Sequence, residues 1–179
     1  MQNKIVELTA RAKIEFQKNQ FKEAAADFRS CLTMLTPDGE PLEIAEMRNN
    51  LGVSLVRSAD YQTALDVLLG TDTVFAGAHE TQKQGMALAN IASAYAGLKE
   101  YDQAASAYTQ AIECFKQCGD KKLCSITLRA LSDLQLKSGK QYQAIGTLQA
   151  AYLEKPRTTL KDKFFSSALG EIIHKLLGY

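Results

Sequence analysis

The fold is decided by one stretch of sequence, Tyr101-Asp102-Gln103-Ala104-Ala105-Ser106-Ala107-Tyr108-Thr109-Gln110-Ala111, because its pattern returns along the chain every 40 residues. Ala104 belongs to a column of alanines and Tyr108 to a column of large apolar residues, while a third column holds only small residues. In chain order the columns are Ala24, Ala64, Ala104 and Ala144; Phe28, Leu68, Tyr108 and Leu148; and Ala12, Gly52, Ala92 and Ser132. A fixed internal period of this length indicates stacked repeats.

Helical periodicity runs through the whole chain, since apolar residues recur at three- and four-residue spacing in almost every segment. Turn residues such as Gly119-Asp120 separate the segments. The predicted helices cover about residues 3–17, 21–35, 42–57, 61–75, 80–97, 101–117, 121–137 and 141–154, with a ninth from Thr158 or Thr159 to Leu177. Each unit is therefore a helix, a tight turn and a second helix. The small columns allow close helix approach, and only stacking buries the apolar faces.

Composition excludes several classes of function. The 179 residues carry a net charge of +1, which gives no field strong enough to attract nucleic acid or an anionic membrane. No apolar run approaches the ~20 residues that a spanning helix needs. The N-terminus lacks a secretory signal, so we expect a cytoplasmic protein. The four cysteines have no CxxC spacing and are predicted to be buried hydrophobes rather than a metal or redox site.

Catalytic patterns are missing from the sequence. His79 and His174 have no partner arrangement and are interpreted as surface residues. The chain contains no glycine-rich phosphate loop and no metal-ligand spacing. We therefore expect a protein that is not an enzyme and has no cofactor or metal.

These columns resemble the tetratricopeptide repeat. The match is clearest in the third unit, which contains Asn90-Ile91-Ala92, Tyr95, Tyr101, Ala104, Tyr108 and Ala111. The period of 40 resembles the extended-repeat subclass of kinesin light chains and spindle-orientation adaptors. The resemblance implies one all-α domain over 1–179, a right-handed α-solenoid with repeats at about 3–40, 41–80, 81–120 and 121–156 and a capping helix or half repeat at 158–179. Arg11 and Glu15 replace the usual leucine and tyrosine, as expected of an end repeat that faces water.

The resemblance also implies that the first helices line a concave groove that binds a peptide or a partner segment. The polar residues that these helices carry are Lys13, Asn49, Asn50, Arg57, Asn90, Ser93, Arg129 and Asp133. Asn50 and Asn90 occupy the same place in adjacent repeats, where extended-repeat members use asparagine to hold a peptide backbone. The alternative is that both satisfy the ends of neighbouring helices. A chaperone C-terminal tail is not expected, because Thr9 and Met86 stand where its clamp needs other residues.

The last predicted helix carries a broad apolar stripe behind a basic flank. The stripe consists of Phe164, Phe165, Ala168, Leu169, Ile172, Ile173, Leu176 and Leu177. It is interpreted first as a cover for the open end of the fourth repeat. Homodimerisation through residues 164–177 is the second interpretation, and docking on a membrane surface is the least favoured.

The sequence therefore predicts a non-enzymatic interaction module that holds a protein or peptide partner in its groove. Two alternatives remain open. One is a homo-oligomeric scaffold assembled through the last helix, and the other is a regulatory fragment of a larger protein. Tyr179 is compatible with a natural end and with a truncated chain.

Overall fold

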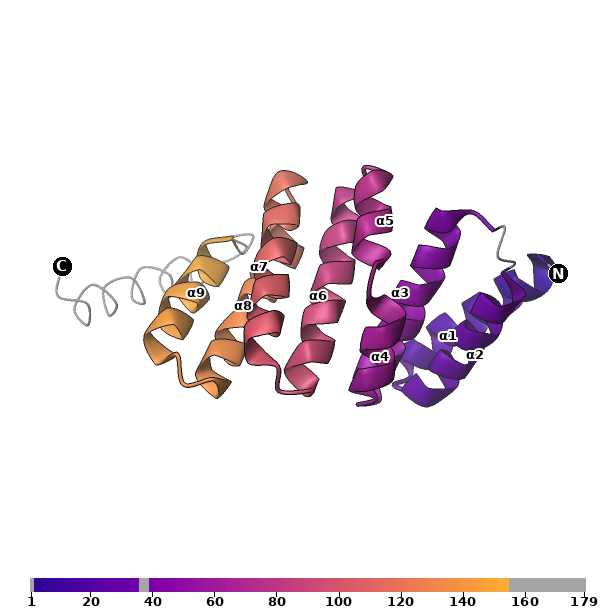
Figure 1. The fold of residues 1–179 in the computed structure, drawn as a ribbon, viewed down its shortest axis with the longest axis horizontal. Helices are drawn as coiled ribbons and strands as arrows, with labels where there is room; N and C mark the ends of the chain where they lie inside the picture. Colours follow the sequence, from indigo (N-terminus) through magenta and orange to yellow (C-terminus); the bar gives the residue numbers. More distant parts are fainter. Residues whose placement is uncertain (1, 36–38, 155–179) are drawn as a thin grey trace.

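The computed structural model describes residues 2–35 and 39–154, and these form an elongated row of antiparallel helices (Figure 1). The described helices are α1 (Gln2–Gln17), α2 (Phe21–Met34), α3 (Pro41–Arg57), α4 (Tyr61–Leu68), α5 (Thr71–Gly77), α6 (Thr81–Gly97), α7 (Tyr101–Gln117), α8 (Lys121–Lys137) and α9 (Gln141–Glu154). The pairs α1–α2, α6–α7 and α8–α9 are hairpins of the expected kind. In the second repeat α3 pairs with two short helices, α4 and α5.

One turn geometry joins six pairs of successive helices in the described chain; the junctions after α2 and α4 differ from it. In each of the six turns one residue has positive φ: Asn19, Ala59, His79, Lys99, Gly119 and Gly139. The next N–H then donates to the carbonyl five residues earlier, as from Gln20 to Glu15 at 2.9 Å and from Asp60 to Leu55 at 3.0 Å. This is the Schellman pattern, which satisfies carbonyls at the end of a helix. Asp120 also caps the N-terminus of α8, because its Oδ1 accepts from the Leu123 N–H at 2.9 Å.

The core follows the three sequence columns. Ala12, Ala24, Ala64, Ala92 and Ala104 are completely buried, and the helices meet at these positions. A very close approach lies in the second repeat, where a Cβ on Gly52 would stand 2.4 Å from the Leu68 side chain. In the fourth repeat the Ser132 hydroxyl donates to the Ala144 carbonyl at 2.8 Å. Two members of the predicted columns are therefore in direct contact there.

The prediction of one continuous helix over 61–75 is wrong. The chain breaks at Leu69 and Gly70, and Gly70 has a φ of 87°. The carbonyls released at the end of α4 are taken up by α3: Arg48 Nε donates to the Val67 carbonyl at 2.8 Å and Arg48 Nη2 to the Leu69 carbonyl at 2.9 Å. Because these bonds come from another helix, the break cannot be recognised in the local pattern.

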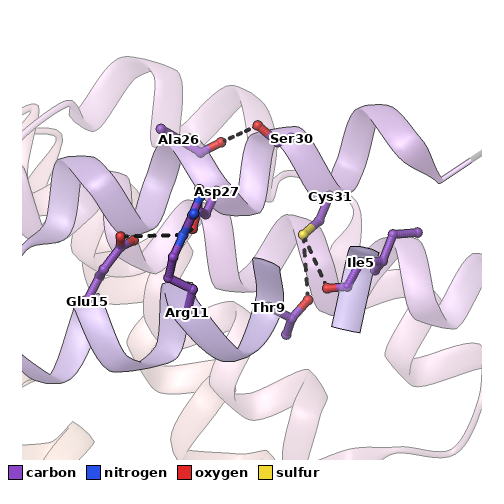
Figure 2. A network of polar contacts seen from close by, with 8 residues as sticks. All are labelled: Ile5, Thr9, Arg11, Glu15, Ala26, Asp27, Ser30 and Cys31. Atoms are coloured by element: carbon purple, nitrogen blue, oxygen red, sulfur yellow. Dashed lines mark hydrogen bonds and ion pairs between the residues drawn. The ribbon is translucent and has the colours of Figure 1, made fainter. Parts of the chain in front are cut away.

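The end repeat replaces apolar packing with an ion pair. Arg11 lies in the column of Leu51, which is 1% exposed, but its own side chain is 59% exposed and donates two hydrogen bonds to Asp27. Figure 2 shows Arg11 reaching across from α1 to Asp27 on α2, with Glu15 beside it at 3.8 Å. Asp27 raises the pKa of Arg11, first by accepting its hydrogen bonds and then by its charge. The expectation that Arg11 faces water is confirmed, whereas the Glu15 side chain is only 20% exposed.

The predicted last helix, the stripe within 164–177 and His174 lie outside the described residues. The three interpretations of that stripe therefore stay predictions. Within residues 2–35 and 39–154, no helix combines the length and apolarity that crossing a membrane requires.

Two glycine substitutions test the packing at the helix contacts. Gly52→Ala forces a Cβ against Leu68, and we expect it to lower the free energy of unfolding by about 1–3 kcal/mol. Gly146→Ala meets nothing within 4 Å in α9, so we expect a gain of about 0.5–1 kcal/mol from helix propensity. Urea unfolding followed by circular dichroism measures both. Equal effects of the two substitutions would contradict the close approach at Gly52.

Candidate functional site

Three neighbouring pockets hollow the surface formed by α1, α3 and α6. The first, of about 390 Å³, lies between the N-terminal halves of α1 and α3 and includes Val6 and Glu43. The second, of about 230 Å³, lies between their C-terminal halves and includes Phe16 and Val53. The third, of about 260 Å³, lies between α3 and α6 above Phe75. We call the three together the Asn50 groove, because Asn50 lines every one of them.

Asn50 and Lys13 are the two predicted site residues with free side chains at this groove. The Asn50 carbonyl accepts the Ser54 hydroxyl, but its side-chain amide makes no hydrogen bond to the described part of the chain. Lys13 lines two of the pockets and has no ion pair with any described residue. An amide donor and acceptor and an ammonium group therefore stand side by side on the walls, available to a ligand.

Asn49 and Asn90 are engaged with each other. The Asn90 side chain donates from Nδ2 to Asn49 Oδ1 at 3.0 Å, a bond that links α3 to α6. Asn49 is largely buried, whereas Asn50 and Asn90 are half-buried. Asn50 and Asn90 therefore differ in their hydrogen bonding, although the two share a column: within the described part of the chain the Asn50 amide is free, and the Asn90 amide is bonded to Asn49. Neither the Asn50 nor the Asn90 side chain bonds to the end of a neighbouring described helix.

The Ser93 hydroxyl also has hydrogen-bond partners within the fold. Its hydroxyl donates to the Ala89 carbonyl at 2.8 Å and lies 3.0 Å from the Tyr108 hydroxyl. Because a serine has only one proton to donate, Tyr108 must be the donor to Ser93. Burial raises the pKa of Tyr108, and the negative charge of Asp133 raises it further. Ser93 opposes this rise, because its hydroxyl can turn and donate to the ionised Tyr108 oxygen.

The remaining predicted residues lie outside the three pockets. Arg57 is exposed at the end of α3, and its guanidinium stands 4.7 Å above the Phe21 ring. Arg129 and Asp133 are exposed on α8. The structure therefore brings Lys13, Asn49 and Asn50 together at the groove and places the other five around it.

One further column belongs to this surface and holds Val6, Glu46, Met86 and Ile126. Val6 and Met86 line the groove and are 64% and 41% exposed, and the equivalent residue on α8, Ile126, is 54% exposed. The signal was present in the sequence as a column with three apolar residues on predicted first helices, but only the structure shows that these residues face outward.

Charge in the groove is partly neutralised. Lys83 Nζ lies 2.7 Å from Glu46 Oε1 and 3.4 Å from Glu80 Oε1, and its hydrogen bond to Glu46 is the main cause of the raised pKa of Lys83. Glu43 has no ion pair with a described residue. No cluster of three or more metal-ligating side chains occurs in residues 2–35 and 39–154. What the groove offers is hydrogen bonding, apolar surface and single charges.

A double-mutant cycle tests whether Ser93 belongs to the core network. We expect Ser93→Ala and Tyr108→Phe each to destabilise the protein, with a coupling of about 0.5–1.5 kcal/mol because they remove the same bond. Denaturant unfolding of the two single variants and the double variant gives this coupling. Additive effects would show that the bond does not contribute to stability.

The buried Tyr108 hydroxyl also predicts an alkaline effect. Its folded pKa is raised above the unfolded value of about 10, so the folded state holds the proton more tightly. The stabilisation from this group is complete below about pH 10 and is lost as the pH rises through the folded pKa. Wild type should therefore lose stability more steeply above pH ~10 than Tyr108→Phe does. Parallel pH profiles would exclude this contribution.

Comparison with known proteins supports the fold. No protein-family model matches the chain, and no curated protein matches it. Solved structures do match it, and two of them illustrate the similarity. The apo form of RapI matches 97% of this chain and 62% of its own, with 18% identity and a TM-score of 0.77. BtubC (BKLC) from P. vanneervenii matches 97% and 73%, with 14% identity and a TM-score of 0.68.

At these identities the similarity concerns the fold alone, and the chain spans less than two thirds of the length of RapI. The expected all-α architecture of stacked helix pairs is confirmed over the residues that the structure describes. The protein therefore has the fold of tetratricopeptide-repeat proteins.

Proposed function

We propose that this protein is a non-enzymatic interaction module that holds an extended segment of a partner protein in the Asn50 groove. One observation carries the proposal: Asn50 lines all three pockets while its side-chain amide has no bond to the described chain. A half-buried amide at the centre of a hollow surface is ready to bind without first breaking another bond.

An amide suits a peptide backbone, because it presents a donor and an acceptor in the same plane. Such contacts do not depend on the partner's side chains, so Asn50 supplies binding without specificity. Lys13 stands next to it in two of the pockets and attracts a carbonyl or carboxylate oxygen. The apolar pocket walls then decide which side chains fit.

The neighbouring polar residues support this centre. The bond between Asn90 and Asn49 ties α3 to α6 and fixes the helix that carries Asn50. Ser93 is held by Tyr108 in the same way. Arg57, Arg129 and Asp133 are exposed beyond the pockets and are available to a longer partner segment.

A library of random displayed peptides tests the proposal with two matched variants. We expect wild type to enrich peptides that bind Asn50→Ala about tenfold or more weakly, since a buried hydrogen-bonding pair at an interface contributes more than about 1.4 kcal/mol. Asn90→Ala is the control, because it removes an identical side chain from the same column of the next repeat. It should lower thermal stability more than Asn50→Ala does and leave most of the peptide affinity.

Circular dichroism must show that both variants remain helical. If Asn50→Ala and Asn90→Ala weaken binding equally, the assignment of Asn50 as the centre is wrong. If no peptide depends on Asn50, the groove is not the binding site.

A further inference from the structure

We propose that the partner segment lies along the seam between α1 and α3, with an apolar side chain at one end and a basic side chain at the other. This inference rests on the proposed function and names the chemistry of the partner. It follows from the placement of the two pockets that share Lys13 and Asn50.

The two pockets form one path along the seam. One runs from Ile5 to Lys13 on α1 and from Glu43 to Asn50 on α3. The other continues from Lys13 to Gln17 and from Asn50 to Val53. From the first of these pockets to the second, the residue numbers rise on both helices. Lys13 and Asn50 line both pockets and therefore lie where the two meet. A segment on this path runs parallel to the helices and has its backbone beside the Asn50 amide.

The end of the seam at Val53 is apolar and rigid. Phe28, which is 3% exposed, forms its base, and Phe16 and Val53 form its walls. Phe16 meets the ring of Phe21 edge to face at 5.1 Å, and Arg57 covers that ring at 4.7 Å. Since Phe16 is held by these contacts and Phe28 is buried, this part of the pocket is formed before a ligand arrives, and little ordering of it is needed on binding.

The repeats supply an internal comparison for this pocket. Tyr108 occupies the column of Phe28, and Ser93 occupies the column of Lys13, so Phe28 and Lys13 are the equivalent pair in the first repeat. In the third repeat the Tyr108 hydroxyl bonds to Ser93 across the space between them. Phe28 has no hydroxyl with which to form that link, and Val53, which lines the same pocket from the second repeat, has no polar side-chain atom. An apolar side chain from a partner is the occupant that gains most from displacing water at such a surface.

The opposite end of the seam is acidic. Glu43 and Glu46 both line the pocket there, above the nearly buried Ile5 and Met47. Lys83 already neutralises Glu46, so Glu43 is the carboxylate whose charge is unmatched among the described residues. A lysine or arginine of the partner provides the complementary charge, and such pairs fix register and orientation more than affinity.

The helix geometry sets the spacing of the two features. Glu43 and Val53 are separated by ten residues of α3, which corresponds to about 15 Å at 1.5 Å per residue. An extended chain covers about 3.3 Å per residue. The basic side chain should therefore stand about four or five positions from the apolar one.

The experiment selects peptides from the random displayed library on wild type, Val53→Phe, Glu43→Lys and Asn50→Ala. Wild type should yield Asn50-dependent peptides in which an apolar and a basic position recur at that spacing. Val53→Phe fills the apolar pocket and should weaken a synthetic enriched peptide about tenfold. Glu43→Lys should weaken it and, on reselection, change the basic position to an acidic one. Ile14→Phe and Glu23→Lys are matched controls at exposed sites outside the groove and should change neither.

The outcomes separate this inference from the function on which it rests. Asn50-dependent peptides without the two spaced positions, or without a charge reversal on Glu43→Lys, would overturn the seam and leave the binding module standing. Enrichment that ignores Asn50 would overturn both. Glu43→Gln guards against misfolding, because it removes the charge with little change in shape and should abolish the basic preference alone.

Discussion

The structure depends on one constraint, the close contact of the two helices within each hairpin. At Gly52 the Leu68 side chain occupies the space that a Cβ would need, and Ala12 and Ala92 are completely buried at the equivalent places. Larger side chains there would separate the helices and expose the apolar residues between them. Because each hairpin must meet the next at the same angle, the small positions repeat every 40 residues, and the stack follows from them.

The same constraint produces the groove. A first helix that turns its small residues toward the second helix must present another face to the outside, and that face carries Lys13, Asn50 and Val53. These positions lie outside the close contact between the helices, and the four repeats differ there. One column contains Lys13, Val53, Ser93 and Asp133, which are a cation, an apolar residue, a hydroxyl and an anion. The repeats are alike where they pack and different where a partner would bind.

Most of the helices and most of the core could be predicted from the sequence, because the columns of small and large residues can be read directly from its 40-residue period. The sequence was insufficient wherever a side chain from another helix decides the outcome. The break at Gly70 is stabilised by Arg48, which lies on α3. Asn50 and Asn90 look identical in the columns, yet Asn90 is bonded to Asn49 on the neighbouring helix. Sequence could propose eight groove residues, but only their contacts show which have free donors and acceptors.

The repeats of the stack differ in how residues at equivalent positions are used. In the third repeat the Tyr108 hydroxyl and Ser93 form a hydrogen bond between two helices, and that bond stabilises the fold. In the first repeat Phe28 and Lys13 stand at the equivalent positions and form no such bond, and with Val53 of the second repeat they line a pocket. The first repeat also replaces apolar packing at its outer edge with the ion pair between the exposed Arg11 and the largely buried Asp27. Because Lys13 and Phe28 make no bond to each other, both can contact a ligand, and this difference between the repeats supports the placement of the proposed binding site in the N-terminal half of the stack.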